Sequence, residues 1–594
     1  MKKLIAMALS AAMMLSMFTA CSSEGKEQGG ETLGESKSAD IVIIGAGGAG
    51  MTAAVQAKMD GATNVVIVEK ASVTGGNTTR ATGGLNASET KYQAADGIED
   101  SNDLYFEDTM KGGKNLNNPD LVRYMVEKSK DAVDFVNEIG GDLAVVGQFG
   151  GASVKRIHRP SDTSSVGPML VKTLTAKLEE MKVPVLFNTK AEEIVMNDGK
   201  VAGVKVTDEN GTYIIDCKAV VMSTGGFSAN TEMVIEYNPK LEGFGTTNVP
   251  GAMGEGIKMG VAVGAATVDL DQIQTHPTVN PDTQTMYTEG VRGNGAILVN
   301  KEGNRFINEL ETRDVVSAAI LKQTDKVAYM VFDQEVRDSL KAIEKYVKAG
   351  IVMESDTIEG LAELIGADPA TLKATMDSYA EMVKSGSADE LGRENIEVSL
   401  TTPKYYACLC APAVHHTMGG LKIDTAAQVI STEDAVIPGF FAAGEVTGGV
   451  HGGNRLGGNA VTDIVVFGRT AGASANSYVV ENGGYTEPTI VVEGAEETET
   501  VKPEVEANFK DGTYTAKSKG MADMTVEVVV KDGEIVSIEL IECGETEGIY
   551  EAALKEVIPA IIKGQTTEVD VAAGATLTSN AIIAAVTDVM NQAA

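Results

Sequence analysis

A glycine-rich loop near the start of the chain is the first segment whose residue types and spacing indicate chemistry. Gly45-Ala46-Gly47-Gly48-Ala49-Gly50 matches the G-x-G-x-x-G pattern, follows the apolar run Asp40 to Ile44 and opens a helix-like stretch that ends at Met59. In this pattern the first glycine makes a tight turn, the second lets the backbone approach a pyrophosphate, and the third allows close helix–strand packing. The N-terminus of the helix offers N–H groups and a positive dipole end to the phosphates. The loop therefore predicts a dinucleotide site.

A carboxylate follows the next apolar run at the spacing that such loops use. Val65-Val66-Ile67-Val68 predicts a second strand, and Glu69 comes 19 residues after Gly50. A carboxylate there hydrogen-bonds ribose hydroxyls and repels a 2′-phosphate. The alternative, a chance glycine turn, explains neither the strands nor the acid, so we expect a strand–loop–helix–strand unit that binds a nucleotide.

Three further segments identify the kind of nucleotide. Gly75-Gly76-Asn77-Thr78-Thr79-Arg80 and Gly83-Gly84-Leu85-Asn86 follow closely, and Gly439-Phe-Phe-Ala-Ala-Gly-Glu445 lies far downstream. With them, the chain from about Ala39 to Tyr478 resembles the flavoprotein subunits of the fumarate reductase/succinate dehydrogenase family, most closely the soluble flavocytochrome c branch. The resemblance implies FAD. The FAD-binding residues that it implies are Gly45, Gly47, Ala49, Gly50, Glu69, Asn77, Thr78, Gly83, Gly84, Glu445, Arg455, Ala460 and Val461.

The mode of FAD binding also follows from the resemblance. Family members in membrane complexes tether FAD through a histidine in the region after the Gly-Gly pair. Thr78 and Thr79 stand in that region here, and no histidine does. We therefore expect non-covalent FAD.

The family pattern also implies a site for a small dicarboxylate. Reducing an enoate needs a hydride donor on one face of the alkene, a proton donor on the other, and groups that orient the carboxylates. Flavin N5 gives the hydride. The implied substrate-binding residues are His276, Met286, Thr288, His415, Arg455, Gly458 and Gly84. Among them, His276 and Thr288 correspond to residues that hold one carboxylate, and His415 and Arg455 to residues that hold the other.

Three charged residues match the family's proton-transfer groups. Arg313, in Thr312-Arg313-Asp314, stands at the position of the proton donor, and Glu289 and Arg292 stand at those of its relay. Arginine is an unusual acid because its pKa is above about 12. The relay answers this difficulty, since it returns a proton to Arg313 as soon as one is donated.

Alternative interpretations of these residues remain. Each histidine could be structural, each arginine could belong to an ordinary ion pair, and Met286 could be core. The neighbouring enzymatic alternative is reduction of another α,β-unsaturated acid of the urocanate, acrylate or cinnamate type, although urocanate reductases carry Tyr at the position of His276. An alternative of another class is a non-catalytic flavin electron-transfer lipoprotein. Steroid dehydrogenation and aspartate oxidation leave the C-terminal flavin motif unexplained.

The end of the chain holds a second flavin motif. Asp570 to Ser579 resembles the flavinylation motif of small FMN-binding domains, in which a flavin transferase esterifies the last threonine of S/T-G-A-T with the FMN phosphate. That residue is Thr576, although Ala573 replaces the usual Ser or Thr. The resemblance implies covalent FMN that passes electrons to FAD; the alternative is a Gly-Ala turn before a capped helix.

The first residues of the chain are typical of a targeting signal rather than of a folded element. Lys2 and Lys3 precede an apolar run from Leu4 to Phe18, which is too short to span a bilayer comfortably. Phe18-Thr19-Ala20-Cys21 resembles the lipobox of bacterial lipoproteins, in which the cysteine is acylated. We expect a lipid anchor at Cys21 and attachment to the extracytoplasmic face of the cell membrane. An ordinary cleaved signal is the alternative.

Length, charge and patterning set the architecture that must position these residues. The 594 residues carry a net charge of −35, which disfavours nucleic-acid partners. No Cys/His cluster has metal-ligand spacing, so we expect no metal. We predict an α/β fold: a Rossmann-like FAD-binding domain with an inserted α+β capping domain, plus a small α+β FMN-binding domain. The expected ranges are signal 1–21, tether 22–38, FAD domain 39–270 and 417–480, cap 271–416, acidic linker 481–506 and FMN domain 507–594.

The electron donor stays open at this level. No second nucleotide loop is evident, so direct use of NADH is not expected. We expect a membrane donor, either a quinone or a flavin pathway.

Overall fold

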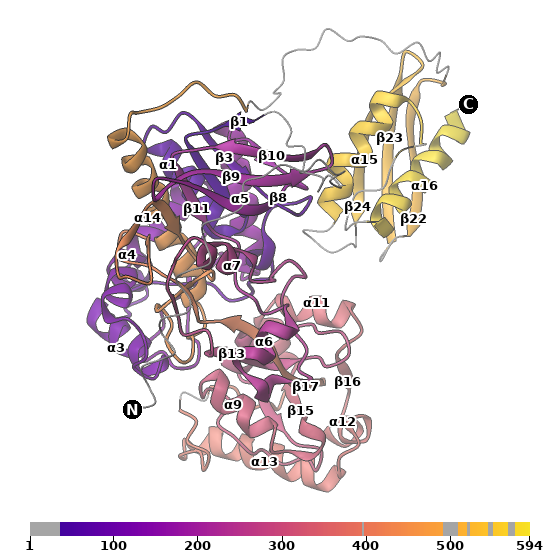
Figure 1. Ribbon diagram of the computed structural model, residues 1–594. Coiled ribbons are helices and arrows are strands. Elements are labelled where there is room, and N and C mark those ends of the chain that lie inside the picture. The colour runs from indigo at the N-terminus through magenta and orange to yellow at the C-terminus, as the bar shows by residue number, and fades with distance from the viewer. Residues whose placement is uncertain are drawn as a thin grey trace, which may run out of the picture.

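The computed structural model describes residues 36–394, 397–490, 509–519, 523–543, 550–567, 569 and 576–593 (Figure 1). The predicted signal segment with Cys21, most of the tether, most of the acidic linker and the motif residues Asp570 to Ala575 lie outside the described residues. Among the described helices, none has the length and apolar composition needed to cross a membrane.

The glycine loop lies at the carboxyl edge of a six-stranded sheet with the order β19-β20-β11-β2-β3-β7. β19 runs antiparallel to β20, and the other neighbours are parallel. These strands are β2 Ile41–Ile44, β3 Val65–Val68, β7 Val185–Leu186, β11 Ala219–Met222, β19 Gln428–Ile430 and β20 Val436–Ala442. Every residue of β2, β3 and β11 is buried, as expected for parallel strands that are covered on both faces.

Helices cover this sheet and bring distant segments together. α1 begins at Gly48, within the glycine loop, and packs against α14, which comes about 400 residues later in the chain (Figure 1). The helices of this part are α1 Gly48–Met59, η1 Gly76–Arg80, α2 Lys91–Ala95, α3 Asn102–Gly112, α4 Pro119–Glu138, α5 Val166–Glu180, α6 Thr231–Tyr237, η2 Pro239–Leu241, α7 Glu255–Ala262 and α14 Asn459–Glu481.

Three smaller sheets complete the FAD-binding part. Their orders are β1-β10-β9-β8, β12-β18-β21 and β4-β6-β5. The strands are β1 Lys37–Ser38, β4 Leu85–Asn86, β5 Val145–Gly147, β6 Ile157–Arg159, β8 Lys190–Asn197, β9 Lys200–Asp208, β10 Gly211–Asp216, β12 Thr267–Val268, β18 Gly420–Lys422 and β21 Thr447–Gly448.

A second unit has its own sheet and its own core, drawn in pink in the lower part of Figure 1. Its buried apolar side chains run from Tyr287 to Cys410 and pack separately from the core around β2. The strands are β13 Ile273–Val279, β14 Ile297–Val299, β15 Ala328–Asp333, β16 Met353–Ser355 and β17 Tyr405–Thr417. The helices are α8 Glu289–Gly293, α9 Arg313–Ile320, η3 Thr324–Lys326, α10 Gln334–Ser339, α11 Ala342–Lys348, α12 Ile358–Ile365 and α13 Pro369–Ser385.

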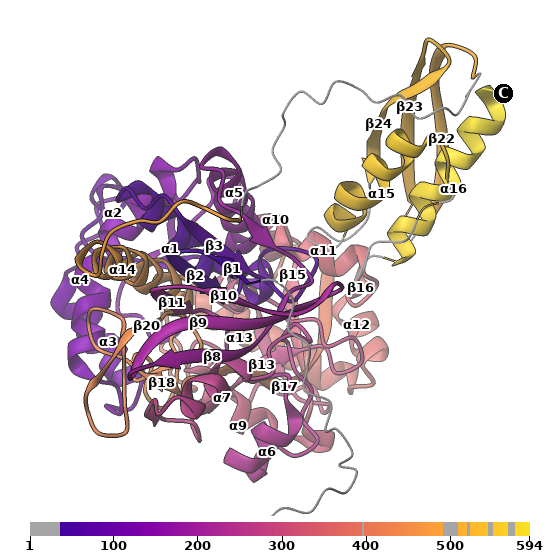
Figure 2. The ribbon, with the colours of Figure 1, turned by 45° about the horizontal axis from the view of Figure 1, so that its top comes forward.

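The C-terminal unit is a three-stranded antiparallel sheet with two helices, seen at one side of the molecule in Figure 2. Its elements are β22 Gly512–Lys519, β23 Asp523–Lys531, β24 Glu534–Cys543, α15 Tyr550–Gly564 and α16 Thr576–Ala593. The turn between β23 and β24 places Asp532 and Gly533 at positive φ, the geometry of a two-residue hairpin. α16 begins at Thr576, the threonine of the second flavin motif. These elements confirm the predicted fold class.

Candidate active site

Two paired strands place two of the predicted substrate-binding histidines side by side. β13 runs antiparallel to β17, with His276 opposite Ala413, two residues before His415. The imidazole rings of His276 and His415 meet edge to face with their centroids 5.1 Å apart. His276 is fully buried, and its Nε2 has no hydrogen-bond partner within the described part of the chain. Thr247 Oγ1 lies 2.7 Å from Nδ1 of His415.

Both histidines are neutral in this environment. Burial lowers the pKa of each well below its usual range, and the positive charges of Arg313 and Arg455 lower the pKa further. A neutral imidazole keeps one N–H, which can donate a hydrogen bond to a carboxylate.

Arg313 is the first residue of α9 and makes two buried hydrogen bonds. Its Nε donates to Glu289 Oε2 at 2.8 Å, and its Nη1 donates to Gln274 Oε1 at 3.1 Å. The Gly150 N–H donates to the other oxygen of Glu289 at 3.2 Å. Burial raises the pKa of Glu289, but Arg313 and Arg292 outweigh it and hold this pKa below its usual range. An ionised carboxylate is therefore fixed against the guanidinium of Arg313.

Arg292 lies one turn along the short helix that begins at Glu289. Thr288 caps this helix, α8, by accepting a hydrogen bond from the Gly290 N–H at 3.4 Å. The Arg292 side chain is buried and donates from Nη1 to the carbonyl oxygen of Glu309. Burial lowers its pKa, and among the described residues neither its Nε nor its Nη2 has a partner. Three of the predicted residues thus come from one helical turn.

Arg455 reaches the same place from the loop before α14. Gln274 Nε2 donates to the Arg455 carbonyl at 2.7 Å, which ties this loop to β13. Burial lowers the pKa of Arg455 to about 9, and its Nε has no partner among the described residues. A Cβ on Gly457 would lie 3.1 Å from Glu289 Oε2 and 3.4 Å from Arg313 Nη2, so this loop passes close to both side chains. We call His276, Glu289, Arg292, Arg313, His415 and Arg455 the active-site constellation.

The remaining predicted substrate-binding residues border this region through their backbones. Met286 is half-buried and bridges to Val279 at the end of β13. A Cβ on Gly84 would lie 2.3 Å from the His158 carbonyl oxygen, and one on Gly458 would lie 2.5 Å from Asn86 Oδ1. Close packing of the chain therefore requires both glycines, and their contact with a substrate stays a prediction.

The glycine loop has the shape that a dinucleotide needs. Gly45 has a φ of +106°, and a Cβ there would lie 2.6 Å from the Ser223 carbonyl oxygen. A Cβ on Gly50 would lie 2.0 Å from the Gly45 carbonyl oxygen. Beside Gly47 the space is open, since a Cβ there would meet only the Gly75 carbonyl oxygen, at 3.9 Å, and no side chain caps α1 there. The residues present fit the pyrophosphate of FAD, with Ala49 in the first turn of the helix.

The neighbouring predicted FAD residues hold the loop in place. Glu69 accepts hydrogen bonds from the backbone N–H groups of Ala46 at 2.7 Å and Ala71 at 2.8 Å. Thr78 Oγ1 accepts from the Gly48 N–H at 3.0 Å, and Asn77 Oδ1 accepts from the Val249 N–H at 2.8 Å. These side chains therefore fix the segments on either side of the sheet edge at which the phosphates are expected.

The downstream predicted FAD residues lie just after β20 and in the first turn of α14. Glu445 Oε1 accepts a hydrogen bond from the Thr417 N–H at 3.0 Å, and burial raises the pKa of Glu445 to about 7. Ala460 and Val461 lie in the first turn of α14, whose N-cap has no side-chain hydrogen bond. A Cβ on Gly83 would lie 2.7 Å from Cε2 of Phe149. The backbone at these positions is therefore suited to bind FAD as a second contact segment.

Sequence reasoning missed three groups that the structure places here. Gln274 bridges Arg313 and the Arg455 loop, and Thr247 contacts His415. Ser223-Thr224-Gly225-Gly226 follows β11 beside the glycine loop, with open space at Gly225. A Gly-Gly pair two residues after an apolar strand was a usable signal for this last segment. Nothing local to Gln274 or Thr247 marks their roles.

Thr576 is the first residue of α16, and no acidic side chain lies in the first turn of that helix. A helix N-terminus favours a phosphate, so the backbone position fits an FMN phosphoester. The Thr576 side chain and the preceding motif lie outside the described residues.

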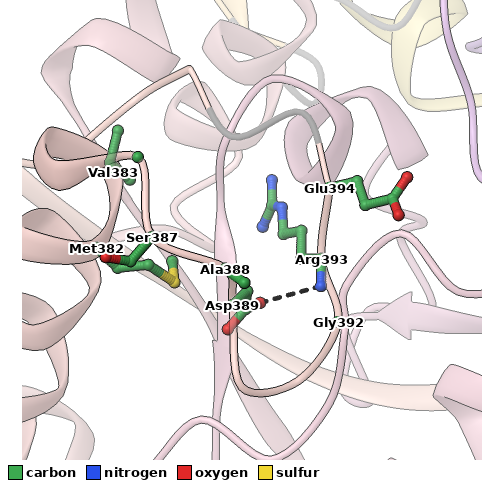
Figure 3. Close-up of a pocket in the computed structure, with 9 residues that line it drawn as sticks. Met382, Val383, Ser387, Ala388, Asp389, Gly392, Arg393 and Glu394 are labelled. Atoms are coloured by element: carbon green, nitrogen blue, oxygen red, sulfur yellow. Dashed lines mark hydrogen bonds between the residues drawn. The ribbon is translucent and has the colours of Figure 1, made fainter.

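A surface cavity of about 350 Å³ lies apart from the constellation, between α13 and residues 386–394 (Figure 3). Asp389 Oδ2 accepts a hydrogen bond from the Arg393 N–H at 3.2 Å at its base. The Arg393 guanidinium donates to the Arg292 carbonyl oxygen at 2.9 Å. Arg393 therefore supports α8 from the side of this cavity.

Known proteins resemble the chain in two parts. Residues 40–461 match the family described as "FAD binding domain", and residues 520–591 match "FMN-binding domain". "Fumarate reductase (cytochrome)" of Shewanella frigidimarina is 46% identical over 445 residues, which cover 75% of this chain and 78% of that protein. "Urocanate reductase" of Eggerthella lenta is 38% identical over 457 residues, which cover 73% of this chain and 74% of that protein.

A solved structure agrees with this assignment. The open conformation of a flavocytochrome c3 fumarate reductase aligns with a TM-score of 0.64 and 41% identity, over 75% of this chain and 79% of that one. By sequence, by fold and by its nucleotide loop, the chain belongs to the fumarate reductase family of FAD-dependent oxidoreductases and carries a C-terminal FMN-binding domain.

Proposed function

We propose that this protein reduces fumarate to succinate. The observation that carries the proposal is a set of buried donors that have no hydrogen-bond partner among the described residues. They are His276 Nε2, Arg292 Nε and Arg455 Nε, and they surround the Glu289–Arg313 pair. Buried polar groups are normally hydrogen-bonded, so these donors indicate a bound anion. The 46% identical relative named fumarate reductase supports the choice of substrate.

The residues of the constellation have different roles in this reaction. His276 and Thr288 bind one carboxylate of fumarate, and His415 and Arg455 bind the other, which fixes the alkene between them. Arg455 adds a positive charge that draws electron density toward its carboxylate. FAD, when bound, supplies a hydride to one alkene carbon. Closure of the capping part over the FAD-binding part excludes water from this reaction.

Arg313 donates a proton to the other alkene carbon. A hydride and a proton added to fumarate give succinate, so charge and electrons balance. Glu289, held at 2.8 Å from the Arg313 Nε, returns a proton to the arginine, and Arg292 passes protons to Glu289. Because Glu289 is ionised and hydrogen-bonded to Arg313, it can accept a proton from Arg292 and pass that proton on to Arg313 without rearrangement.

The cellular setting belongs to the same proposal. Cys21 carries the lipid that anchors the protein to the extracytoplasmic face of the cell membrane. Thr576 would carry FMN attached by a flavin transferase, and the bound FMN would supply electron transfer from a quinone or flavin pathway in the membrane to non-covalent FAD.

A second candidate is reduction of another α,β-unsaturated acid. The relative named urocanate reductase, at 38% identity, favours it. The two pairs of carboxylate-binding groups favour a dicarboxylate instead.

A substrate panel with reduced methyl viologen as the donor separates these candidates. Fumarate should be reduced at least tenfold to a hundredfold faster than crotonate or acrylate, because a monoacid leaves one set of buried donors unpaired, at about 1–3 kcal/mol. Urocanate should behave like the monoacids. Equal rates on fumarate and crotonate, or a preference for urocanate, would remove the fumarate proposal.

A further inference from the structure

Arg159 is a buried guanidinium that none of the roles above uses. It ends β6 and is 8% exposed. Within the part of the chain that the structure describes, its side chain makes no ion pair, and its Nε is enclosed without a hydrogen-bond partner. A buried charge without a paired carboxylate is costly, so a fold that keeps one calls for an explanation.

The guanidinium of Arg159 lies close to the ring of Phe149 and to the backbones of two glycines. Its Cζ is 4.9 Å from the centroid of the Phe149 ring. A Cβ on Gly290 would lie 3.3 Å from Nη2, and a Cβ on Gly147 would lie 3.6 Å from Cζ. The planar guanidinium therefore lies on the face of the Phe149 ring, as in a cation–π contact. The two glycines leave room for it because they have no side chain.

The segments that hold Phe149 and Gly290 are both in contact with or adjacent to Glu289. Phe149 precedes Gly150, whose N–H donates to Glu289 Oε1 at 3.2 Å. Gly290 follows Glu289 in α8. Arg159 thus contacts the residue before one hydrogen-bond donor of Glu289 and the residue after Glu289 itself.

The charge of Arg159 also acts on this carboxylate. Burial lowers the pKa of Arg159 to about 10, and the negative charge of Glu289 opposes that shift. Arg159 is therefore positive at neutral pH. Glu289 is also faced by Arg292 on its own helix, by Arg313 on α9 and by Arg455 from the loop before α14.

We propose that Arg159 is a positioning residue for Glu289: it holds Phe149 and Gly290 in place and adds one of the positive charges that surround this carboxylate. The proposal rests on the proposed function, in which Glu289 returns protons to Arg313. Arg159 itself acts only through Glu289.

The test compares Arg159→Met, which removes the charge, with Arg159→Lys, which keeps it. The control is Arg123→Met, because Arg123 also lies on a phenylalanine face, at 4.1 Å from the Phe106 ring, but belongs to the surface helix α4. In Arg159→Met the acidic limb of the kcat–pH profile for fumarate should move up by about one pH unit, the usual effect of a nearby unit charge. In Arg159→Lys and Arg123→Met this limb should stay within a few tenths of a unit of the wild-type limb.

A second readout does not need turnover. Infrared difference spectra report protonation of the Glu289 carboxyl group, identified by the band that Glu289→Gln removes. This band should titrate at higher pH in Arg159→Met than in the wild type. If the wild-type protein reduces no fumarate, the proposed function fails, and the infrared titration still decides the role of Arg159.

Three outcomes would overturn the proposal. One is a kcat–pH profile of Arg159→Met that superimposes on the wild-type profile after scaling. Another is an unchanged infrared titration. If Arg159→Met does not fold with FAD, Arg159→Lys decides alone, and an acidic limb displaced by a full unit despite the retained charge would contradict the proposal.

Discussion

At the scale of single residues, Arg313 is the side chain on which the proposed chemistry depends most. Arg313→Ala should lower turnover of fumarate by at least about 10²–10⁴-fold, the usual contribution of a positioned acid. FAD should stay bound and reducible by dithionite, because among the described residues the side-chain hydrogen bonds of Arg313 go to Glu289 and Gln274 and none goes to the nucleotide loop. Arg313→Lys should recover part of the activity, since an ammonium group can donate a proton but lacks the planar fork of arginine.

The matched control for Arg313→Ala is Arg337→Ala in the same unit. Arg337 also pairs with a carboxylate, that of Glu344, but this pair is half-buried, whereas Arg313 and Glu289 are buried. Its loss should leave turnover nearly unchanged, because Arg337 does not belong to the active-site constellation. Wild-type turnover in Arg313→Ala would make Arg313 an ordinary ion-pair residue, and His276 would become the first candidate for the proton donor.

Glu445 gives a residue-scale prediction about stability. Burial raises its pKa to about 7 in the folded state from about 4.5 in the unfolded state. The folded state therefore binds the proton more tightly, and the stability that this proton contributes is lost as the pH rises through 7. Between pH 6 and pH 8 the wild-type apoprotein should lose about 1 kcal/mol that Glu445→Gln does not lose.

Urea unfolding of the apoprotein at both pH values measures this difference. A constant difference in unfolding free energy between the wild type and Glu445→Gln would mean that Glu445 is ionised throughout this pH range. Asp389→Asn provides the comparison, because the guanidinium of Arg305 helps to hold the pKa of Asp389 below its usual range despite burial. No proton is then exchanged at this carboxyl near neutral pH.

At the scale of elements, the loop before α14 places the arginines and Glu289 relative to one another. Gly457→Ala would put a methyl group 2.6 Å from Cδ2 of Phe149 and 3.1 Å from Glu289 Oε2. Phe149 is packed against Gly83, so the ring has little room to move. We expect kcat for fumarate to fall by about 10²-fold, the effect of displacing catalytic groups by about 1 Å, with little loss of FAD.

Gly453→Ala is the control in the same loop. A Cβ there would meet only the far ends of Leu116, Lys114 and Gln272 at 3.2–3.4 Å, and flexible side chains of this kind can move aside. Steady-state kinetics and FAD absorbance of both variants measure the difference. Equal kcat values would show that the loop does not fix the geometry of the constellation.

At the scale of the whole molecule, the two flavins should behave differently when the protein unfolds. Protein from a host that has the flavin transferase should release one FAD when denatured and keep one FMN, because only Thr576 carries the expected phosphoester. Thr576→Ala should lack FMN and keep FAD, while Thr513→Ala, at an exposed position of the same domain, should keep both.

Intact-mass spectrometry and flavin absorbance after acid precipitation measure this result. Thr576→Ala that still carries covalent flavin would place the tether on another residue. Release of all flavin from the wild type would remove the covalent link from the proposal.

The sequence by itself determined the local features of this protein, because these depend on neighbouring residues. The glycine loop, the strand before it and Glu69 are adjacent in the chain, and the turn at Asp532 and Gly533 follows from their tolerance of positive φ. The resemblance to a known family supplied the residues of the constellation one segment at a time. The resemblance did not show which residues each segment contacts.

Only the tertiary structure decided which of these residues meet. His276 and His415 lie 139 positions apart in the chain and come together because β13 pairs with β17. Gln274 joins Arg313 to the Arg455 loop, and Arg159, at the end of β6, lies close to Gly290, the residue after Glu289 in α8. Such contacts depend on how two separate cores pack, and side-chain burial, which sets the pKa of each group, is a property of that packing rather than of any local pattern.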